Sequence, residues 1–180
     1  ASRVNHIIVD SLKQGFDEEL TELTTRPTES WSESVFNIRK AVSLANESVF
    51  TTENKVSYEV IVELTVIMSV GSVLSWAQVG GPHILASHPK GLQPLAYEHD
   101  WAWQLFRESP LITTGLGLSK ICQINSGSLQ MTEESFLTLL GRSYIPAAFF
   151  QILDPNLGKM TQCLVEDEPD IPFWMGIIKF

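Results

Sequence analysis

Charged residues are missing from a long stretch in the middle of this chain. Residues 64–89 form 26 consecutive positions without Asp, Glu, Lys or Arg. Unpaired charges are almost never buried, so this run indicates a segment that does not face bulk water. Its uninterrupted apolar part, 64–79, contains polar residues and ends at a Gly-Gly-Pro sequence, short of the roughly 20 apolar residues that a bilayer requires. We therefore expect no transmembrane segment, but a buried central element of a globular domain.

Cysteine is scarce and is not arranged for metal binding. The two cysteines among the 180 residues are Cys122 and Cys163, with no CxxC or Cys/His spacing. We expect two ordinary thiols in a reducing intracellular compartment, such as the cytoplasm, rather than a disulfide framework. The chain shows no positively charged start followed by an apolar segment, so no secretory signal peptide is visible.

Catalytic and cofactor-binding motifs are also absent. Residues 115–120, GLGLSK, bring small residues near a lysine, but their spacing matches neither a P-loop nor a nucleophile elbow. We therefore predict no cofactor and favour a function other than catalysis. The net charge of −9 argues against long-range attraction to nucleic acid. Nucleic acid would be contacted only locally, within an assembly.

Two N-terminal segments have the periodicity of amphipathic helices. Apolar residues recur at steps of three and four over 4–23 and over 35–49, which places them on one face of a helix. Pro27 separates the two segments, because proline disfavours helical angles in the residue before it. We predict one helix over about 4–23 and a second from Thr28 or Ser30 to about Val49.

Residues 53–79 give conflicting signals. Val56 to Val66 nearly alternate between apolar and polar residues, and seven of the twelve residues from Val56 to Ile67 are β-branched, which favours a strand. A strand of more than twenty residues would be abnormal, however, whereas a buried helix of that length is not. Gly71 and Ser75, four positions apart, would also let another helix approach closely. We predict a buried helix over 53–79, with a strand at 56–66 as the alternative.

These segments predict the fold class. We expect a mainly α protein, one domain over 1–180 with about five to seven helices packed around the helix 53–79. An α+β domain built on a strand at 56–66 is the alternative. Residues 80–97 contain three prolines and three glycines, which predicts a long ordered loop. The Thr-Glu-Glu sequence at 132–134 predicts the start of another helix, through Leu140.

The region 80–100 contains the only cluster of potential metal ligands in the sequence. Its members are His83, His88 and His99, with the carboxylates of Glu98 and Asp100. Histidine and carboxylate side chains bind zinc or iron, and histidine titrates near neutral pH. The spacing matches no established zinc motif, so these residues are weak metal candidates and we expect no metal.

Aromatic residues gather in two places. Trp101, Trp103 and Phe106 lie within six positions, close to an arginine, and this composition is typical of contact hot spots. The C-terminal arm, defined here as residues 171–180, is apolar to its last residue and contains Phe173, Trp174, Ile177 and Phe180. Left exposed, it would form an adhesive patch. We therefore predict that these seven residues bind a partner.

Three functional hypotheses follow. The first is a structural, self-assembling or protein-interaction subunit, such as a viral coat or filament protein, acting as a homo-oligomer or with a protein partner. The second is a small metal- or histidine-dependent enzyme with its site in the loop 80–100. The third is an acidic regulator that binds a basic surface of another protein.

Overall fold

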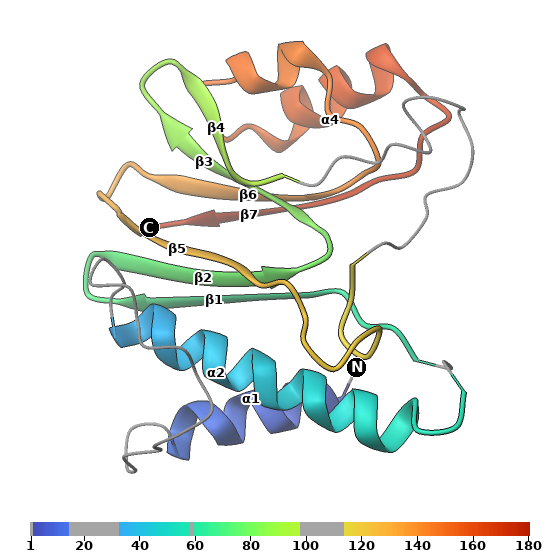
Figure 1. Cartoon of the computed structure of the whole chain (residues 1–180). Helices are drawn as coiled ribbons and strands as arrows, with labels where there is room; N and C mark the ends of the chain where they lie inside the picture. Colours follow the sequence, from blue (N-terminus) through green and yellow to red (C-terminus); the bar gives the residue numbers. More distant parts are fainter. Residues whose placement is uncertain (1, 15–32, 58–59, 98–113) are drawn as a thin grey trace. The chain divides into compact units, whose positions relative to one another are not determined.

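A computed structural model describes residues 2–14, 33–57, 60–97 and 114–180. The chain divides into two compact units, Ala1–Gly80 with Thr113–Gln130 and Gly81–Ile112 with Met131–Phe180. Each unit has its own antiparallel sheet and its own apolar core. The elements of both are labelled in Figure 1.

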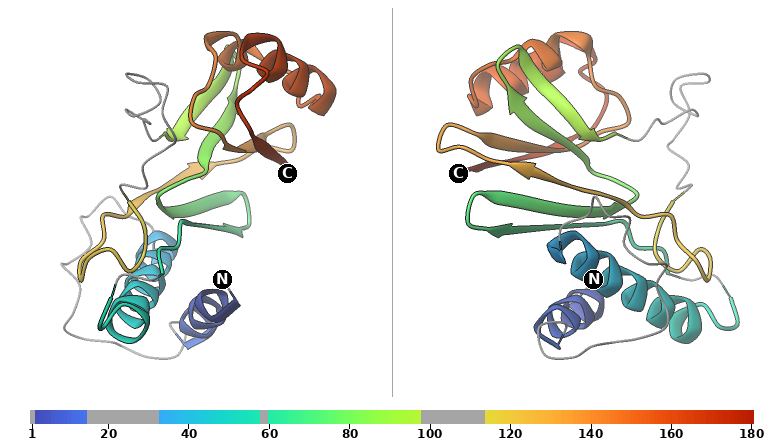
Figure 2. Two further views of the ribbon diagram at one scale, coloured as in Figure 1. Left: turned by 90° about the vertical axis from the view of Figure 1, so that its right-hand side faces the viewer. Right: turned by 60° about the vertical axis from the view of Figure 1, so that its left-hand side comes forward.

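The first unit opens with helices. These are α1 (Ser2–Gln14), α2 (Glu33–Ser48) and the π-helical turn η1 (Val49–Glu53). Helices α1 and α2 lie side by side in both views of Figure 2. Val4 and Ile8 of α1 share one buried core with Ile38 and Val42 of α2. Both predicted helices are confirmed over these ranges, and residues 15–32 lie outside the part of the chain that the structure describes.

A three-stranded antiparallel sheet completes the first unit. Its strands are β1 (Leu64–Val70), β2 (Val73–Val79) and β5 (Asn125–Gln130), in the order β1-β2-β5. The helix predicted over 53–79 is therefore wrong. Two seven-residue strands, joined by a turn at Gly71, replace one element that was too long to be a strand. Gly71 has φ +59° and lies in open space, so it supplies a turn conformation and no close helix contact.

The alternative, an α+β fold, describes the class correctly, and the mainly α prediction is wrong. Its strand lies further along the chain than 56–66, because β1 begins at Leu64 and Val62 makes only an isolated bridge with Leu116. The absence of charge has a clear cause in β2, where Leu74 through Val79 are all buried. None of the helices among the described residues is long and apolar enough to cross a membrane.

The second unit contains a four-stranded antiparallel sheet and short helices. Its strands are ordered β4-β3-β6-β7. The elements are β3 (His83–His88), β4 (Gly91–Ala96), β6 (Phe136–Gly141), the 3-10 helix η2 (Ala147–Gln151), α4 (Leu157–Asp167) and β7 (Trp174–Lys179). The loop predicted at 80–97 is thus largely a β-hairpin, and the helix predicted from Thr132 to Leu140 is instead the strand β6.

One face of this sheet packs against η2 and α4. Phe149 of η2 and Met160 and Leu164 of α4 share a buried cluster with Leu85 of β3 and Leu140 of β6. Figure 2 shows both helices on the same side of the sheet. Two helical elements that follow each other in the chain, η2 and α4, therefore bury one face of this sheet.

Candidate functional site

His83, the first of the metal candidates, takes part in the core of the second unit. Its side chain is buried, and its Nε2 lies 2.7 Å from the carbonyl oxygen of Arg142. The imidazole ring stacks on Tyr97, with centroids 4.8 Å apart. Burial of Tyr97 raises the pKa of its hydroxyl. The contacts of His83 are those of a packed, hydrogen-bonded core residue.

The other metal candidates do not join His83. His88 lies at the exposed end of β3, where its Nδ1 accepts a 3.3 Å hydrogen bond from the backbone N–H of Lys90. It is five positions from His83 on one strand, which places the two rings on opposite faces. His99 and Asp100 lie outside the described residues. Within those residues no three His, Cys, Asp or Glu side chains converge as metal ligands.

The predicted partner-binding residues fall into two groups. Trp101, Trp103 and Phe106 lie outside the described residues, so their role stays a prediction. The C-terminal arm is ordered as β7, which pairs with β6 from Phe136↔Lys179 to Gly141↔Trp174. Its role in binding a partner also stays a prediction.

Alternate side chains of the arm point to opposite faces of the sheet. Phe173, Met175 and Ile177 pack against the core of the second unit, and Phe180 is partly buried. Trp174 is 55% exposed, and its indole lies over Gly141, where a Cβ would come within 2.0 Å of the ring nitrogen. The Trp174 indole therefore packs on a glycine of the neighbouring strand, β6.

Arg142, directly after β6, is a buried cation that sequence reasoning missed. Its Nη1 and Nη2 each donate a 2.9 Å hydrogen bond, to the carbonyl oxygens of Leu164 and Glu168 at the end of α4. The guanidinium also lies 5.9 Å from the ring centroid of Phe173. Burial lowers the pKa of Arg142. A cation hydrogen-bonded to the negative end of a helix stabilises that end. Because Arg142 directly follows β6, these bonds hold the C-terminal end of α4 against the sheet.

Two buried asparagines also connect distant segments by side-chain hydrogen bonds, in the first unit. The Asn46 amide donates to the carbonyls of Ser119 and Lys120, both at 3.0 Å, and its oxygen accepts from the N–H of Gly117. The Asn54 amide donates to the carbonyl of Gly117 at 2.9 Å. Both side chains tie the end of α2 and η1 to the segment that precedes β5, and no spacing in the sequence indicates this pairing.

A cavity of about 230 Å³ lies between α1, η1 and the segment before β1. It is lined by Arg3, Val4, Ile7, Ser48, Val49, Thr52, Glu53, Val60 and Val62. Its floor is apolar, and its polar members include an ion pair between Arg3 and Glu53. We consider this cavity the candidate binding site of the first unit.

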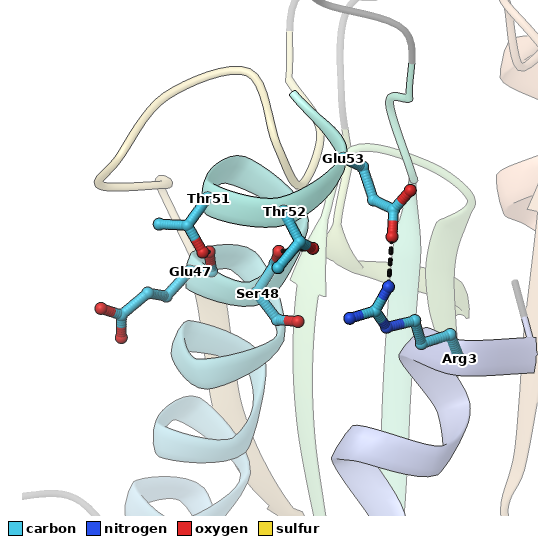
Figure 3. A network of polar contacts seen from close by, with 6 residues as sticks. All are labelled: Arg3, Glu47, Ser48, Thr51, Thr52 and Glu53. Atoms are coloured by element: carbon cyan, nitrogen blue, oxygen red, sulfur yellow. Dashed lines mark hydrogen bonds and ion pairs between the residues drawn. The ribbon is translucent and has the colours of Figure 1, made fainter. Parts of the chain in front are cut away.

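The π-helical turn η1 contributes Val49, Thr52 and Glu53 to the lining of the cavity. Figure 3 shows the Arg3–Glu53 pair, with Glu47 and Thr51 extending away from Arg3. The Thr51 hydroxyl donates to the carbonyl of Glu47 at 2.7 Å, and Thr52 donates in the same way to Ser48. π-Helical turns are rare and frequently occur at functional sites. The sequence predicts a helix that starts at residue 53, whereas η1 ends there, and it does not predict the cavity.

Neither a family model nor a curated protein matches this sequence. Solved structures do match its fold. PppA of Pseudomonas aeruginosa, a key regulatory component of T6SS, is 15% identical, with a TM-score of 0.62 over 100% of this chain and 80% of its own. The serine/threonine phosphatase PstP of Mycobacterium tuberculosis is 10% identical, with a TM-score of 0.61 over 98% of this chain and 80% of its own.

The PPM Ser-Thr phosphatase MsPP of Mycobacterium smegmatis is 16% identical, with a TM-score of 0.58 over 97% of this chain and 81% of its own. This chain has the fold of the PPM phosphatases. The expected structural or self-assembling subunit, such as a viral coat or filament protein, is therefore wrong, because the solved structures that share this α+β fold include serine/threonine phosphatases. The same fold comparison contradicts the two alternatives, a metal- or histidine-dependent enzyme with its site at 80–100 and an acidic regulator.

The fold raises the question of a metal centre. The catalytic domain of PstP has been solved with two manganese ions, at a TM-score of 0.53 to this chain. Manganese prefers oxygen ligands, and a two-metal site holds its ions roughly 3.5–4 Å apart, which requires several converging carboxylate or imidazole ligands. No such group is present among residues 2–14, 33–57, 60–97 and 114–180. The described part of the chain does not fit a two-manganese site.

Proposed function

We propose that this chain is a regulatory domain of the PPM phosphatase fold, which acts in protein phosphorylation signalling without a two-metal hydrolytic centre in its described part. The observation that carries the proposal is a phosphatase fold over 97–100% of the chain, combined with a set of side chains that does not converge on a metal. A shared fold does not imply a shared reaction, because the reaction depends on the residues of the site.

Phosphate release tests this proposal directly. The purified chain would be incubated with phosphoserine and phosphothreonine peptides, with and without Mn²⁺, beside the PstP catalytic domain as an active control. We expect no release above background from this chain and no stoichiometric Mn²⁺ binding by calorimetry. Mn²⁺-dependent release that scales with protein concentration would contradict the proposal and indicate an active phosphatase.

The regulatory part needs a cellular readout. Deleting the gene in its host should change the abundance of specific phosphoserine or phosphothreonine peptides, and the intact gene should restore them. An unchanged phosphoproteome would contradict a role in phosphorylation signalling.

We further propose that regulation proceeds through a protein partner or a second copy of the chain. PppA, which shares the fold, is a regulatory component of T6SS. The exposed Trp174 is a candidate contact, because a large apolar side chain in water favours association. Solution mass measured against concentration would reveal self-association, and a concentration-independent monomer would leave a different protein as the partner.

We also propose that the protein works in a reducing intracellular compartment. Cys122 and Cys163 are both free thiols, and free thiols persist where glutathione and thioredoxin keep them reduced. Thiol titration of protein isolated from its host without reductant should count two thiols per chain, and oxidised cysteines would contradict this localisation.

A further inference from the structure

The cavity beside η1 combines an apolar floor with a mouth that carries both charges. Val4 and Val49 are buried at its floor, at 5% and 4% exposure. Arg3 and Glu53 meet at its rim and remain accessible, with side chains 62% and 38% exposed. The two ends of the cavity therefore differ in chemistry, as binding sites for small molecules commonly do.

The ion pair at the mouth leaves both partners able to bind more. It joins Arg3 Nη1 to Glu53 Oε1, so it uses one of the five N–H donors of a guanidinium and one of the two oxygens of a carboxylate. A ligand carboxylate would accept from the remaining face of Arg3. A ligand ammonium group would donate to the second oxygen of Glu53.

We propose that this cavity binds a small apolar α-amino acid in its zwitterionic form. The aliphatic side chain would lie on the floor formed by Val4, Val49 and Val62. The α-carboxylate would pair with Arg3, and the α-ammonium group with Glu53. Charge-assisted hydrogen bonds of this kind are the strong ones in proteins.

The mouth selects a zwitterion over a singly charged ligand. A simple carboxylic acid would place its negative charge beside Glu53, and an amine would place its positive charge beside Arg3. Each of these ligands would thus pair with one charged group of the mouth and place a like charge beside the other. A zwitterion pairs with both groups and keeps the site neutral.

The size of the cavity sets the size of the ligand. Drug-sized ligands occupy pockets of roughly 300–1,000 Å³, whereas this cavity measures about 230 Å³. Leucine and its isomers are ligands of suitable size, while a dipeptide would extend into solvent. This binding function is separate from the phosphorylation role proposed above.

Calorimetry with the full chain and L-leucine tests the inference. The comparison ligands are leucinamide, which lacks the carboxylate, 4-methylpentanoate, which lacks the ammonium group, and L-serine, which lacks the apolar side chain. We expect leucine to bind and each of the others to bind about tenfold more weakly or not at all. Leucinamide and 4-methylpentanoate each lose one charged hydrogen bond, and L-serine loses the burial of the apolar side chain.

Substitutions at the mouth locate the site. Glu53→Gln should weaken leucine binding about tenfold and strengthen 4-methylpentanoate binding, because it removes a like-charge contact of that ligand. Arg3→Gln should weaken leucine binding to the same degree and strengthen leucinamide binding for the same reason. Asp10→Asn and Lys13→Gln are matched controls, because they remove the same charges from α1 at positions outside the cavity lining. Both controls should bind leucine like the unmodified protein.

Two results would overturn the inference. The first is no detectable heat of leucine binding by a chain whose thermal unfolding shows that it is folded. The second is leucine binding that neither Glu53→Gln nor Arg3→Gln weakens. Because phosphate release and amino-acid binding are measured separately, failure of one proposal leaves the other to be judged on its own assay.

Discussion

Gly91 lies against neighbouring backbone that leaves no room for a side chain. Its φ is +131°, which L-residues rarely adopt, and a Cβ at this position would come within 2.0 Å of the carbonyl oxygen of Phe150. Gly71 offers a natural comparison, because its φ of +59° is also positive but nothing lies within 4 Å of the added carbon. Substitutions at the two glycines therefore distinguish backbone strain, which both positions impose, from steric overlap, which only Gly91 imposes.

We predict that Gly91→Ala destabilises the protein by roughly 2–5 kcal/mol, since strain and overpacking add. Gly71→Ala should cost only about 1–2 kcal/mol, the penalty of the left-handed conformation alone. Urea unfolding of both variants measures the difference. Equal losses would show that Phe150 moves aside without cost.

The two cysteines link stability to pH. Burial raises the pKa of both thiols, and the carboxylates of Asp167 and Glu166 raise that of Cys163 further. Because the folded state retains these protons at a pH where the unfolded chain releases them, the neutral thiols stabilise the fold fully below the ordinary thiol pKa of about 8.5. This stabilisation is lost as the pH rises through the folded pKa.

We therefore expect the urea midpoint to fall between about pH 8 and pH 10. Replacing both cysteines by alanine should make the urea midpoint fall less steeply between about pH 8 and pH 10. The dependence of the midpoint on pH near neutrality should stay unchanged. Iodoacetamide should alkylate the native thiols more slowly than the urea-unfolded ones at pH 8. If the urea midpoint falls just as steeply in the double variant, the decline arises from other groups. Tyr97 is one such group, because burial also raises the pKa of its hydroxyl.

At the scale of elements, α4 depends on a residue outside it. Its N-terminus is capped locally, where the Asn156 side chain accepts from the N–H of Lys159, a pattern readable from sequence. Its C-terminal carbonyls are bound by Arg142, 22 and 26 positions earlier in the chain. The N-terminal end of α4 is thus stabilised by a neighbouring residue, Asn156, and its C-terminal end by Arg142, which follows strand β6.

We predict that Arg142→Met costs about 2–4 kcal/mol, because it removes two charge-assisted hydrogen bonds from the C-terminal carbonyls of α4. Arg142→Lys should recover only part of this loss, since an ammonium group cannot match the fork of a guanidinium. Lys159→Met, at an exposed position of α4, is the control and should be nearly neutral. Hydrogen exchange should show that the last turn of α4 opens first in the Arg142 variants, and uniform protection would contradict this role.

At the scale of the whole molecule, the C-terminal arm belongs to a sheet. Strand β7 pairs with β6 over six residue pairs, and Phe173, Met175 and Ile177 pack in the core of the second unit. The sequence predicted that this arm binds a partner. Since the arm forms a strand of its own chain, its removal should instead destabilise the fold.

We expect deletion of 171–180 to lower the unfolding midpoint and to remove amide protection from β6, which would lose its partner strand. Deleting Phe180 alone removes one backbone hydrogen bond, to the carbonyl of Ser135, and should have a much smaller effect. Full stability of the truncated chain would mean that β7 contributes little to the sheet. The expectation of one domain over 1–180 stays a prediction, and coincident unfolding of both units would support it.

The sequence by itself determined the elements whose pattern is local. The stripes of α1 and α2, and the burial of the charge-free run where it forms β2, could each be read from spacing and composition. The alternation and β-branched content before Ile67 also indicated a strand, although β1 begins further along. Local patterns are reliable where neighbouring residues decide the conformation.

Only the tertiary structure decided how the strands are partnered and which distant residues meet. Apolar residues at 73–79 are compatible with a buried helix or a buried strand, and pairing with β1 and β5 selects the strand. The contacts of Arg142 with α4, and of Asn46 with Gly117, join positions far apart in the chain. Arg3 and Glu53 are 50 positions apart, so the cavity between them exists only after α1 has packed. Such sites form because folding brings separated segments together, and no spacing in the sequence records that approach.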